Sequence, residues 1–313
     1  MRVFLAGATG ALGQSLAPML VQAGHDVVGS TSSQPRFELL ERMGVEPALM
    51  DGLDAEAVRS AVLGAEPDVV IHQLTALRGV RNIKKLDHEL ELTNRLRTEG
   101  TDHLLAAAQE AGAKRFVAQS YTGWPNPRTG GPVKTEDDGL DPRPTPASRR
   151  TVEALRHVEE VVPSTSGMAG IVLRYGSFYG PGTGLGPGGE MFEMVRKRQF
   201  PVVGGGTGVW SMIHVEDAAR ATLKALDHGE PGLYNVVDDE PAPVAEWLPE
   251  LAARIGAKPP RQLPSWLAKP LIGEQGVSMM TRTRGSSNAK AKRELDWEPR
   301  YPSWREGFRS GLG

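Results

Sequence analysis

A short apolar segment followed at once by three evenly spaced glycines is the feature that most constrains the fold. Val3 to Ala6 reads as a buried strand, and a helical pattern begins at Gln14. Between them, Gly7 lets the chain leave the strand tightly, Gly10 lets the backbone approach a phosphate, and Gly13 lets the helix pack closely. The free N–H groups of the helix N-terminus favour an anion. We therefore expect a dinucleotide-binding turn made by Gly7, Thr9, Gly10, Ala11, Leu12 and Gly13.

Apolar stretches alternate with amphipathic ones from Met1 to about Leu173. The expected strands are 3–6, 27–29, 46–49, 69–72, 116–118 and 170–173, and the expected helices lie around 14–23, 36–43, 54–63, 89–111 and 147–162. Parallel strands need such helical crossovers, whose right-handedness leaves few topologies. The alternation therefore predicts an α/β fold with a doubly wound, Rossmann-like parallel sheet.

The composition of the sequence changes after Gly180. Residues 180–208 are rich in glycine and residues 240–275 in proline. We expect a dinucleotide-binding domain over 1–179, to which 210–238 return, and a small C-terminal substrate-binding cap made of 180–209 and 239–313. The proline-rich loop from Tyr121 to Pro146 follows the fifth strand and should border the ligand cleft.

Composition excludes several classes of function. The chain has 313 residues, a formal net charge of −2 and no cysteine, so disulfides, thiolate nucleophiles and cysteine-ligated metals are absent. The balanced charge gives no pull toward nucleic acid or an anionic membrane. No apolar run approaches the roughly 20 residues of a membrane span, and the first strand leaves no room for a leader. We expect a cytoplasmic protein with a small-molecule substrate and no metal.

Seven pieces of sequence, the glycine turn among them, follow in the order of a known family. They are the glycine turn, Met50 to Asp54, Gln119-Ser120, Leu173 to Pro181, Ile213 to Asp217, Tyr234 to Val236 and Arg293 to Pro299. With them the chain resembles an extended short-chain dehydrogenase/reductase of the NAD-dependent epimerase/dehydratase type. The resemblance implies the same Rossmann-like fold, a nicotinamide cofactor and a possible homodimer through the helix faces at 98–111 and 147–162.

The resemblance also implies cofactor contacts beyond the glycine turn. Asp51 would hold the adenine amino group, and Leu74 to Ala76 would run beneath the cofactor. The full set of further positions is Asp51, Gly52, Leu53, Leu74, Thr75, Ala76, Gln119, Arg149, Tyr175, Gly176 and Phe178. In the same way, the resemblance implies that the motif around His214 joins the cap to the sheet rather than binding a metal.

The end of the second strand indicates which cofactor is bound. An acid there would hold the ribose hydroxyls of NAD, but the chain reads Gly-Ser-Thr-Ser-Ser over 29–33. Thr31 and Ser32, with Arg36 nearby, favour the 2′-phosphate of NADP over NAD, although NAD stays possible. In the alternative interpretation the hydroxyls cap the next helix and Arg36 faces water.

The chain departs from the family at its catalytic pair. Members usually carry Tyr-x-x-x-Lys, in which the lysine lowers the pKa of the phenol and holds the ribose. None of the five tyrosines here has a lysine four residues on, and the best register sets Thr145 and Arg149 at these positions. Arg149 can still hold the ribose, whereas Thr145 is too weak an acid. Ser120 matches the family's catalytic hydroxyl, and Tyr121 is the nearest phenol in sequence.

Three functions stay open at this stage. The first is an oxidoreductase with an atypical proton donor, either Tyr121 or Tyr179. The second is a non-catalytic NADP-binding sensor or scaffold, and the third is a nucleotide-sugar epimerase or dehydratase. Trp210 stands where relatives that bind nucleotide sugars carry an arginine, so a small uncharged carbonyl or hydroxyl substrate is favoured, unless Trp210 is a core residue. Trp124 and Tyr179 are further candidates for the pocket wall.

Overall fold

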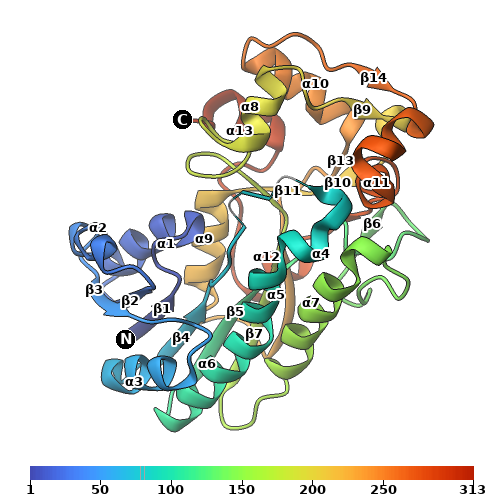
Figure 1. The fold of residues 1–313 in the computed structure, drawn as a ribbon. Helices are drawn as coiled ribbons and strands as arrows, with labels where there is room; N and C mark the ends of the chain where they lie inside the picture. Colours follow the sequence, from blue (N-terminus) through green and yellow to red (C-terminus); the bar gives the residue numbers. More distant parts are fainter. Residues whose placement is uncertain (78, 81) are drawn as a thin grey trace.

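The computed structural model describes residues 1–77, 79, 80 and 82–313. Its main layer is a parallel sheet with helices on both faces, and a smaller lobe lies beyond the carboxyl ends of the strands (Figure 1). Across the described residues the sheet has seven strands in the order β12-β7-β5-β4-β1-β2-β3. The strands are β1 (Arg2–Ala6), β2 (Asp26–Thr31), β3 (Glu46–Leu49), β4 (Val69–His72), β5 (Arg115–Tyr121), β7 (Ala169–Tyr175) and β12 (Gly232–Val236). The predicted doubly wound sheet is confirmed.

Two apolar layers sandwich the sheet. One contains the buried faces of α1 (Ala11–Gln22), α2 (Phe37–Arg42) and α9 (Val215–Lys224), and the other those of α3 (Ala55–Ala65), α6 (Glu99–Glu110) and α7 (Arg149–Val161). Shorter elements of this lobe are η1 (Gln34–Arg36), η2 (Ile83–Lys85), α4 (Leu86–Glu89), α5 (Glu91–Arg97), β6 (Val133–Lys134) and η3 (Pro146–Ser148). Burial on both faces explains the near-continuous apolar runs of the strands.

The helix expected over 89–111 is interrupted, which corrects that boundary. The segment forms α4, α5 and α6, with Thr98 between the last two at φ −97° and ψ −84°. The Thr98 hydroxyl donates to the carbonyl oxygen of Asn94 at 3.1 Å, and such back-bonding competes with regular helix. The break makes α5 and α6 two separate helices.

The smaller lobe has a core of its own. Trp247, Trp304 and Phe308 are among its buried side chains. The elements after β7 are β8 (Ser177–Tyr179), α8 (Glu190–Arg196), β9 (Val202–Val203), η4 (Gly204–Gly206), β10 (Val209–Trp210), β11 (Met212–His214), β13 (Ala242–Pro243), α10 (Val244–Arg254), β14 (Gln262–Leu263), α11 (Ser265–Thr281), β15 (Gly285–Ser286), α12 (Ala289–Glu294) and α13 (Trp304–Ser310). No helix in the described part of the chain is both long and apolar enough to cross a membrane.

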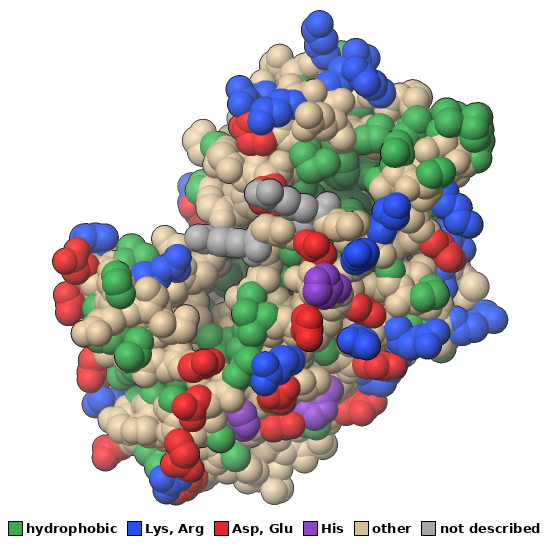
Figure 2. Space-filling model, in the orientation of Figure 1, with side chains coloured by type: hydrophobic (Ala, Val, Ile, Leu, Met, Phe, Trp, Pro, Cys, Tyr) green, Lys and Arg blue, Asp and Glu red, His purple; other side chains and the backbone are tan. Residues whose placement is uncertain are grey.

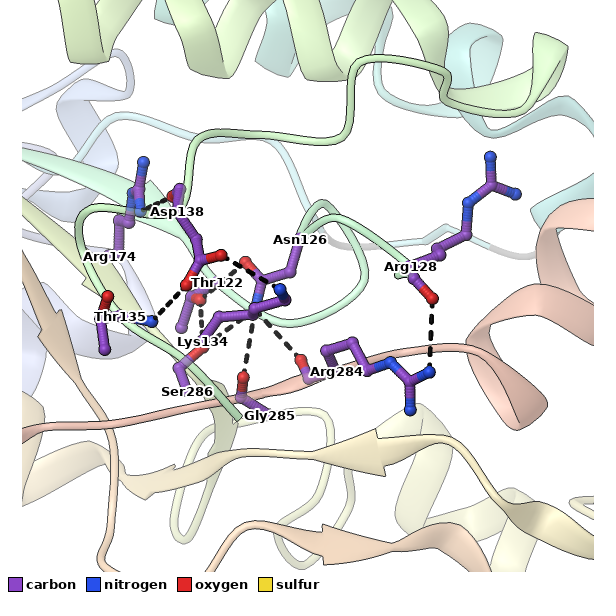
Figure 3. A network of polar contacts seen from close by, with 10 residues as sticks. All are labelled: Thr122, Asn126, Arg128, Lys134, Thr135, Asp138, Arg174, Arg284, Gly285 and Ser286. Atoms are coloured by element: carbon purple, nitrogen blue, oxygen red, sulfur yellow. Dashed lines mark hydrogen bonds and ion pairs between the residues drawn. The ribbon is translucent and has the colours of Figure 1, made fainter. Parts of the chain in front are cut away.

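Two sets of polar contacts join the lobes. The ring of His214 contacts the Gly311 carbonyl oxygen at 2.7 Å, and the Asp217 carboxylate accepts from the amides of Arg300 and Tyr301 at 2.7 and 2.8 Å. The long loop after β5 is held by Asn126, whose side-chain amide donates to the Arg284 carbonyl oxygen at 3.0 Å (Figure 3). The loop is therefore fixed against the cap rather than left in solvent.

His72, at the end of β4, is buried as a neutral ring. Its Nδ1 accepts from the Leu74 amide at 3.3 Å, its Nε2 contacts the Thr101 hydroxyl at 3.1 Å, and burial lowers its pKa to about 4. Since the unfolded chain binds this proton near pH 6.5, His72 stabilises the fold above that pH. We expect this contribution, about 3 kcal/mol in the free energy of unfolding, to disappear between pH 6.5 and 4.

Urea unfolding across this pH range measures the effect. His72→Gln should flatten the pH dependence of the unfolding free energy, whereas His88→Gln, at an exposed position, should keep the wild-type slope. Equal slopes for wild type and His72→Gln would contradict the assignment.

Candidate functional site

In the glycine turn, backbone atoms pack directly against other backbone atoms. Gly7 has φ 91°, and its carbonyl oxygen accepts from the Gly10 amide at 3.0 Å. A Cβ added at Gly13 would lie 2.4 Å from the Gly7 carbonyl oxygen, and one at Gly7 would lie 2.8 Å from that of Gln73. No side chain caps α1 at Gly10, so its first N–H groups are free for an anion. The residues present fit a dinucleotide pyrophosphate.

At the adenosine end of the site, some of the expected groups are free to bind a 2′-phosphate and others bond the backbone. The Arg36 guanidinium lies 3.3 Å from the Thr9 hydroxyl and 3.5 Å from the Thr9 carbonyl oxygen, which brings it over the phosphate turn. The Thr31 hydroxyl accepts from the Ser33 amide at 3.3 Å and so serves the backbone, while Ser32 is exposed. Arg36 and Ser32 are thus the groups available to a 2′-phosphate.

The next loops along the carboxyl edge come together as expected for a cofactor bed. The Asp51 carboxylate accepts from the Leu53 amide at 3.0 Å, which shapes its turn and leaves it exposed. A Cβ on Gly52 would lie 2.6 Å from the Leu74 side chain, and the Gln119 amide donates to the Leu74 carbonyl oxygen at 3.3 Å. The ends of β3, β4 and β5 therefore meet at one edge.

Ser120 and Tyr121 project to opposite faces of β5, as neighbours in a strand do. The Ser120 hydroxyl donates to Glu159 at 2.7 Å, and Glu159 forms a two-pronged buried pair with Arg174 at 2.6 and 2.8 Å. Ser120 is therefore engaged behind the strand. The Tyr121 hydroxyl lies 2.9 Å from the Ser177 hydroxyl, and burial raises the pKa of the phenol.

Thr145 and Arg149 do not share an environment. Thr145 is buried and donates to Gln275 at 2.6 Å, whereas Arg149 begins α7 and is exposed. The face of α7 that packs inward carries Thr151 and Leu155, four residues apart and both fully buried. A phenol is missing from this face and from the register that the sequence favoured, and the cation of that register, Arg149, is exposed.

Trp124 stands between two small hollows. One is lined by Tyr121, Trp124, Ser177 and Trp210, among others, and the second includes Arg128, Asp141, Thr145 and Gln275. The surface of the molecule is recessed between the lobes in the view of Figure 2. The Trp210 indole donates to the Met279 carbonyl oxygen at 2.9 Å and packs 5.1 Å from Trp247, so this residue is both a cap core residue and a wall of the hollow.

The other tyrosines are packing residues. The Tyr175 hydroxyl contacts Thr222 at 2.7 Å and accepts from Gln73 at 3.2 Å, and its ring lies 5.3 Å from Phe178. Tyr179 is fully buried in the cap core, edge-on to Phe308, and burial raises the pKa of its phenol. Neither phenol lines the described hollows.

Arg97 is a residue that the sequence reasoning missed. It ends α5 and is only 6% exposed, and its Nε has no hydrogen-bond partner among the described residues. Burial lowers its pKa to about 10, and its charge acts on Tyr121. The signal lay in the helical spacing, because Arg97 falls four residues after Thr93 on the buried side of α5, where a charge is out of place.

Comparison with known proteins decides the family. The family model described as the NAD dependent epimerase/dehydratase family matches residues 3–236, which include the glycine turn and all seven strands of the main sheet except the first residue of β1. The chain belongs to this family. The resemblance seen in the sequence is confirmed, and a nicotinamide dinucleotide is supported as its cofactor.

Relatives and solved structures agree with this membership. A protein of Streptomyces sp. named 3-diazoavenalumate denitrifying reductase is 45% identical over 98% of this chain and 99% of its own length. UDP-glucose 4-epimerase of Thermotoga maritima, solved with UDP-glucose, has a TM-score of 0.77 at 22% identity and covers 100% of this chain and 97% of its own. A human epimerase family protein solved with NADPH has a TM-score of 0.75 at 19% identity, with 100% and 99% covered.

These similarities are consistent with an NAD(P)-dependent enzyme of the oxidoreductase/epimerase type, because the similar proteins include a named reductase and a named epimerase. Both solved structures are below 25% identity and bear on the fold alone. The roles of individual residues therefore rest on the geometry described above.

The glycine turn yields a direct test. Gly10→Ala should lower the affinity for NADPH about tenfold or more, because the new Cβ, tolerable at 3.3 Å from the Gly7 carbonyl oxygen, occupies the approach of the pyrophosphate. Thermal unfolding should change little. Gly64→Ala, where a Cβ meets nothing within 4 Å, is the matched control, and titration of NADPH fluorescence is the measurement. Unchanged affinity in Gly10→Ala would place the cofactor elsewhere.

Proposed function

We propose that the protein is an NADPH-dependent reductase of a small molecule, and that its preferred acceptor is a diazo group. One observation carries the proposal. The loops that would hold the cofactor meet at one edge, whereas neither the register of Thr145 and Arg149 nor the buried face of α7 supplies a phenol. An enzyme built in this way keeps the means to deliver hydride and lacks the family's usual means to protonate an oxygen.

The chemistry of a diazo acceptor suits such a site. Hydride addition to a carbonyl produces an alkoxide, which needs an acid close by. A hydride and an arenediazonium ion instead give an arene and dinitrogen: a C–H bond replaces the C–N bond, the hydride's electron pair cancels the positive charge, and no proton is required. The name of the Streptomyces relative, a denitrifying reductase of a diazo compound, supports this choice.

A second candidate is carbonyl reduction with Tyr121 as the acid. Its hydroxyl lies in the hollow beside Ser177, and because burial raises its pKa the phenol stays protonated and able to donate. Ser120 takes no part in proton transfer in this candidate mechanism, because its hydroxyl donates a hydrogen bond to Glu159. Trp124 and Trp210 would form the wall against which a flat substrate packs.

The remaining alternatives have less support. A nucleotide-sugar substrate calls for a cation near the diphosphate, and the residue in the corresponding place is Trp210, which donates to a backbone carbonyl oxygen. A non-catalytic sensor would bind NADPH without oxidising it under any of the conditions below. A homodimer through α6 and α7 and a cytoplasmic location stay predictions.

Turnover assays separate these functions. We expect NADPH absorbance at 340 nm to fall with an aryl diazo compound, with one dinitrogen released per NADPH consumed, and Tyr121→Phe to keep that rate within about threefold. Ketones and aldehydes should react at least tenfold more slowly. If carbonyls are reduced faster and Tyr121→Phe loses that activity, the second candidate is correct.

The choice of cofactor depends on Arg36 in this proposal. Arg36→Gln should weaken NADPH binding about tenfold, because a charge-assisted contact with the 2′-phosphate is lost, and should leave NADH binding within about twofold. Calorimetry with both nucleotides measures the two affinities. Arg42→Gln, an exposed position six residues further on, is the control. Tighter binding of NADH by the wild type would refute the preference for NADP.

A further inference from the structure

A buried cation without a matching anion stands at the end of α5. Arg97 is 6% exposed, and its Nε has no hydrogen-bond partner among the described residues. Most buried guanidinium groups are held by carboxylates or carbonyl oxygens, because the loss of hydration otherwise goes uncompensated. An arginine kept in this state has the character of a ligand-binding residue.

The neighbouring acid is already engaged. Glu159 accepts two hydrogen bonds from Arg174 and one from Ser120, and its carboxylate is 6% exposed. Counted together, the buried side chains of Arg97, Arg174 and Glu159 carry a net charge of +1. Tyr121 does not balance this charge, because burial keeps its phenol protonated. An anion from outside the chain would restore neutrality.

The surroundings of Arg97 indicate what kind of anion fits. Tyr121, on which its charge acts, has its ring 6.1 Å from that of Trp124, and both rings pack against the apolar cluster of Leu140, Val152 and Leu155. Such surroundings suit a flat apolar body with one anionic end. The planar donor fork of a guanidinium matches a carboxylate in a two-pronged contact.

We propose that Arg97 binds the carboxylate of an aromatic or conjugated acid whose body packs against the Tyr121 and Trp124 rings. The inference rests on the proposed reductase function and names its substrate class. It also replaces the expectation of an uncharged substrate, which depended on Trp210 alone. The reacting group is then set at a fixed distance from the carboxylate, so Arg97 selects by length as well as by charge.

Binding of matched probes to the NADPH-loaded protein tests this without turnover. Cinnamate should bind at least tenfold more tightly than cinnamamide, which has the same shape without the charge. Arg97→Met should abolish the preference, and Arg97→Lys, which keeps the charge but not the fork, should keep part of it. Arg95→Met, on the exposed side of α5 and paired with Glu99, should leave it unchanged. Calorimetry gives each affinity, and circular dichroism verifies folding.

Three outcomes would overturn the inference. They are equal binding of acid and amide by the wild type, a preference retained in Arg97→Met, and a tenfold loss of NADPH affinity in Arg97→Met or Arg97→Lys with the preference intact, which would assign Arg97 to the cofactor. The two proposals fail separately. Diazo reduction without a carboxylate preference removes only this inference, whereas a carboxylate preference without turnover removes only the reductase function.

Discussion

The contact between the start of α1 and the end of β1 is the constraint on which the rest of the structure depends. At Gly13 the helix backbone comes so close to the Gly7 carbonyl that a single methyl group would not fit. This closeness directs the free N–H groups of α1 at the carboxyl edge of the sheet. Because parallel strands all end at that edge, the loops after β2, β3, β4 and β5 meet there, and the cap closes over it (Figure 1).

Buried polar networks then divide the edge into structural and free groups. Ser120, Glu159 and Arg174 neutralise and bond one another behind β5, and the His214 and Asp217 contacts hold the cap. Networks of this kind rigidify a fold when they are fully satisfied. What they leave unsatisfied is therefore informative, and among the described residues the Nε of Arg97 is one such atom.

The fold could be predicted from the sequence because its signals are local. Most strands of the main sheet contain a short apolar run, and β3 and β4 match their predicted bounds. The site was harder to predict than the fold. Spacing along the chain does not show which side of a helix faces inward when polar residues lie on both sides. Sequence spacing set Thr145 and Arg149 at the positions of the family pair, and it could not show that Thr145 is buried while Arg149 is exposed at the start of α7. The role of Ser120 likewise depended on the buried partner Glu159, 39 residues away.

A phenol and a cation still act on each other at the carboxyl edge, although they come from β5 and α5 rather than from α7. Burial raises the pKa of Tyr121 while Arg97 lowers it, and burial is the larger effect. In the usual family pair the cation serves to make the phenol acidic. Here the phenol stays a neutral hydrogen-bond donor and the cation keeps its charge, with its pKa near 10. Such a pair is suited to holding a negatively charged substrate in place, and it leaves the driving force of reduction to the hydride and to the departure of a stable product.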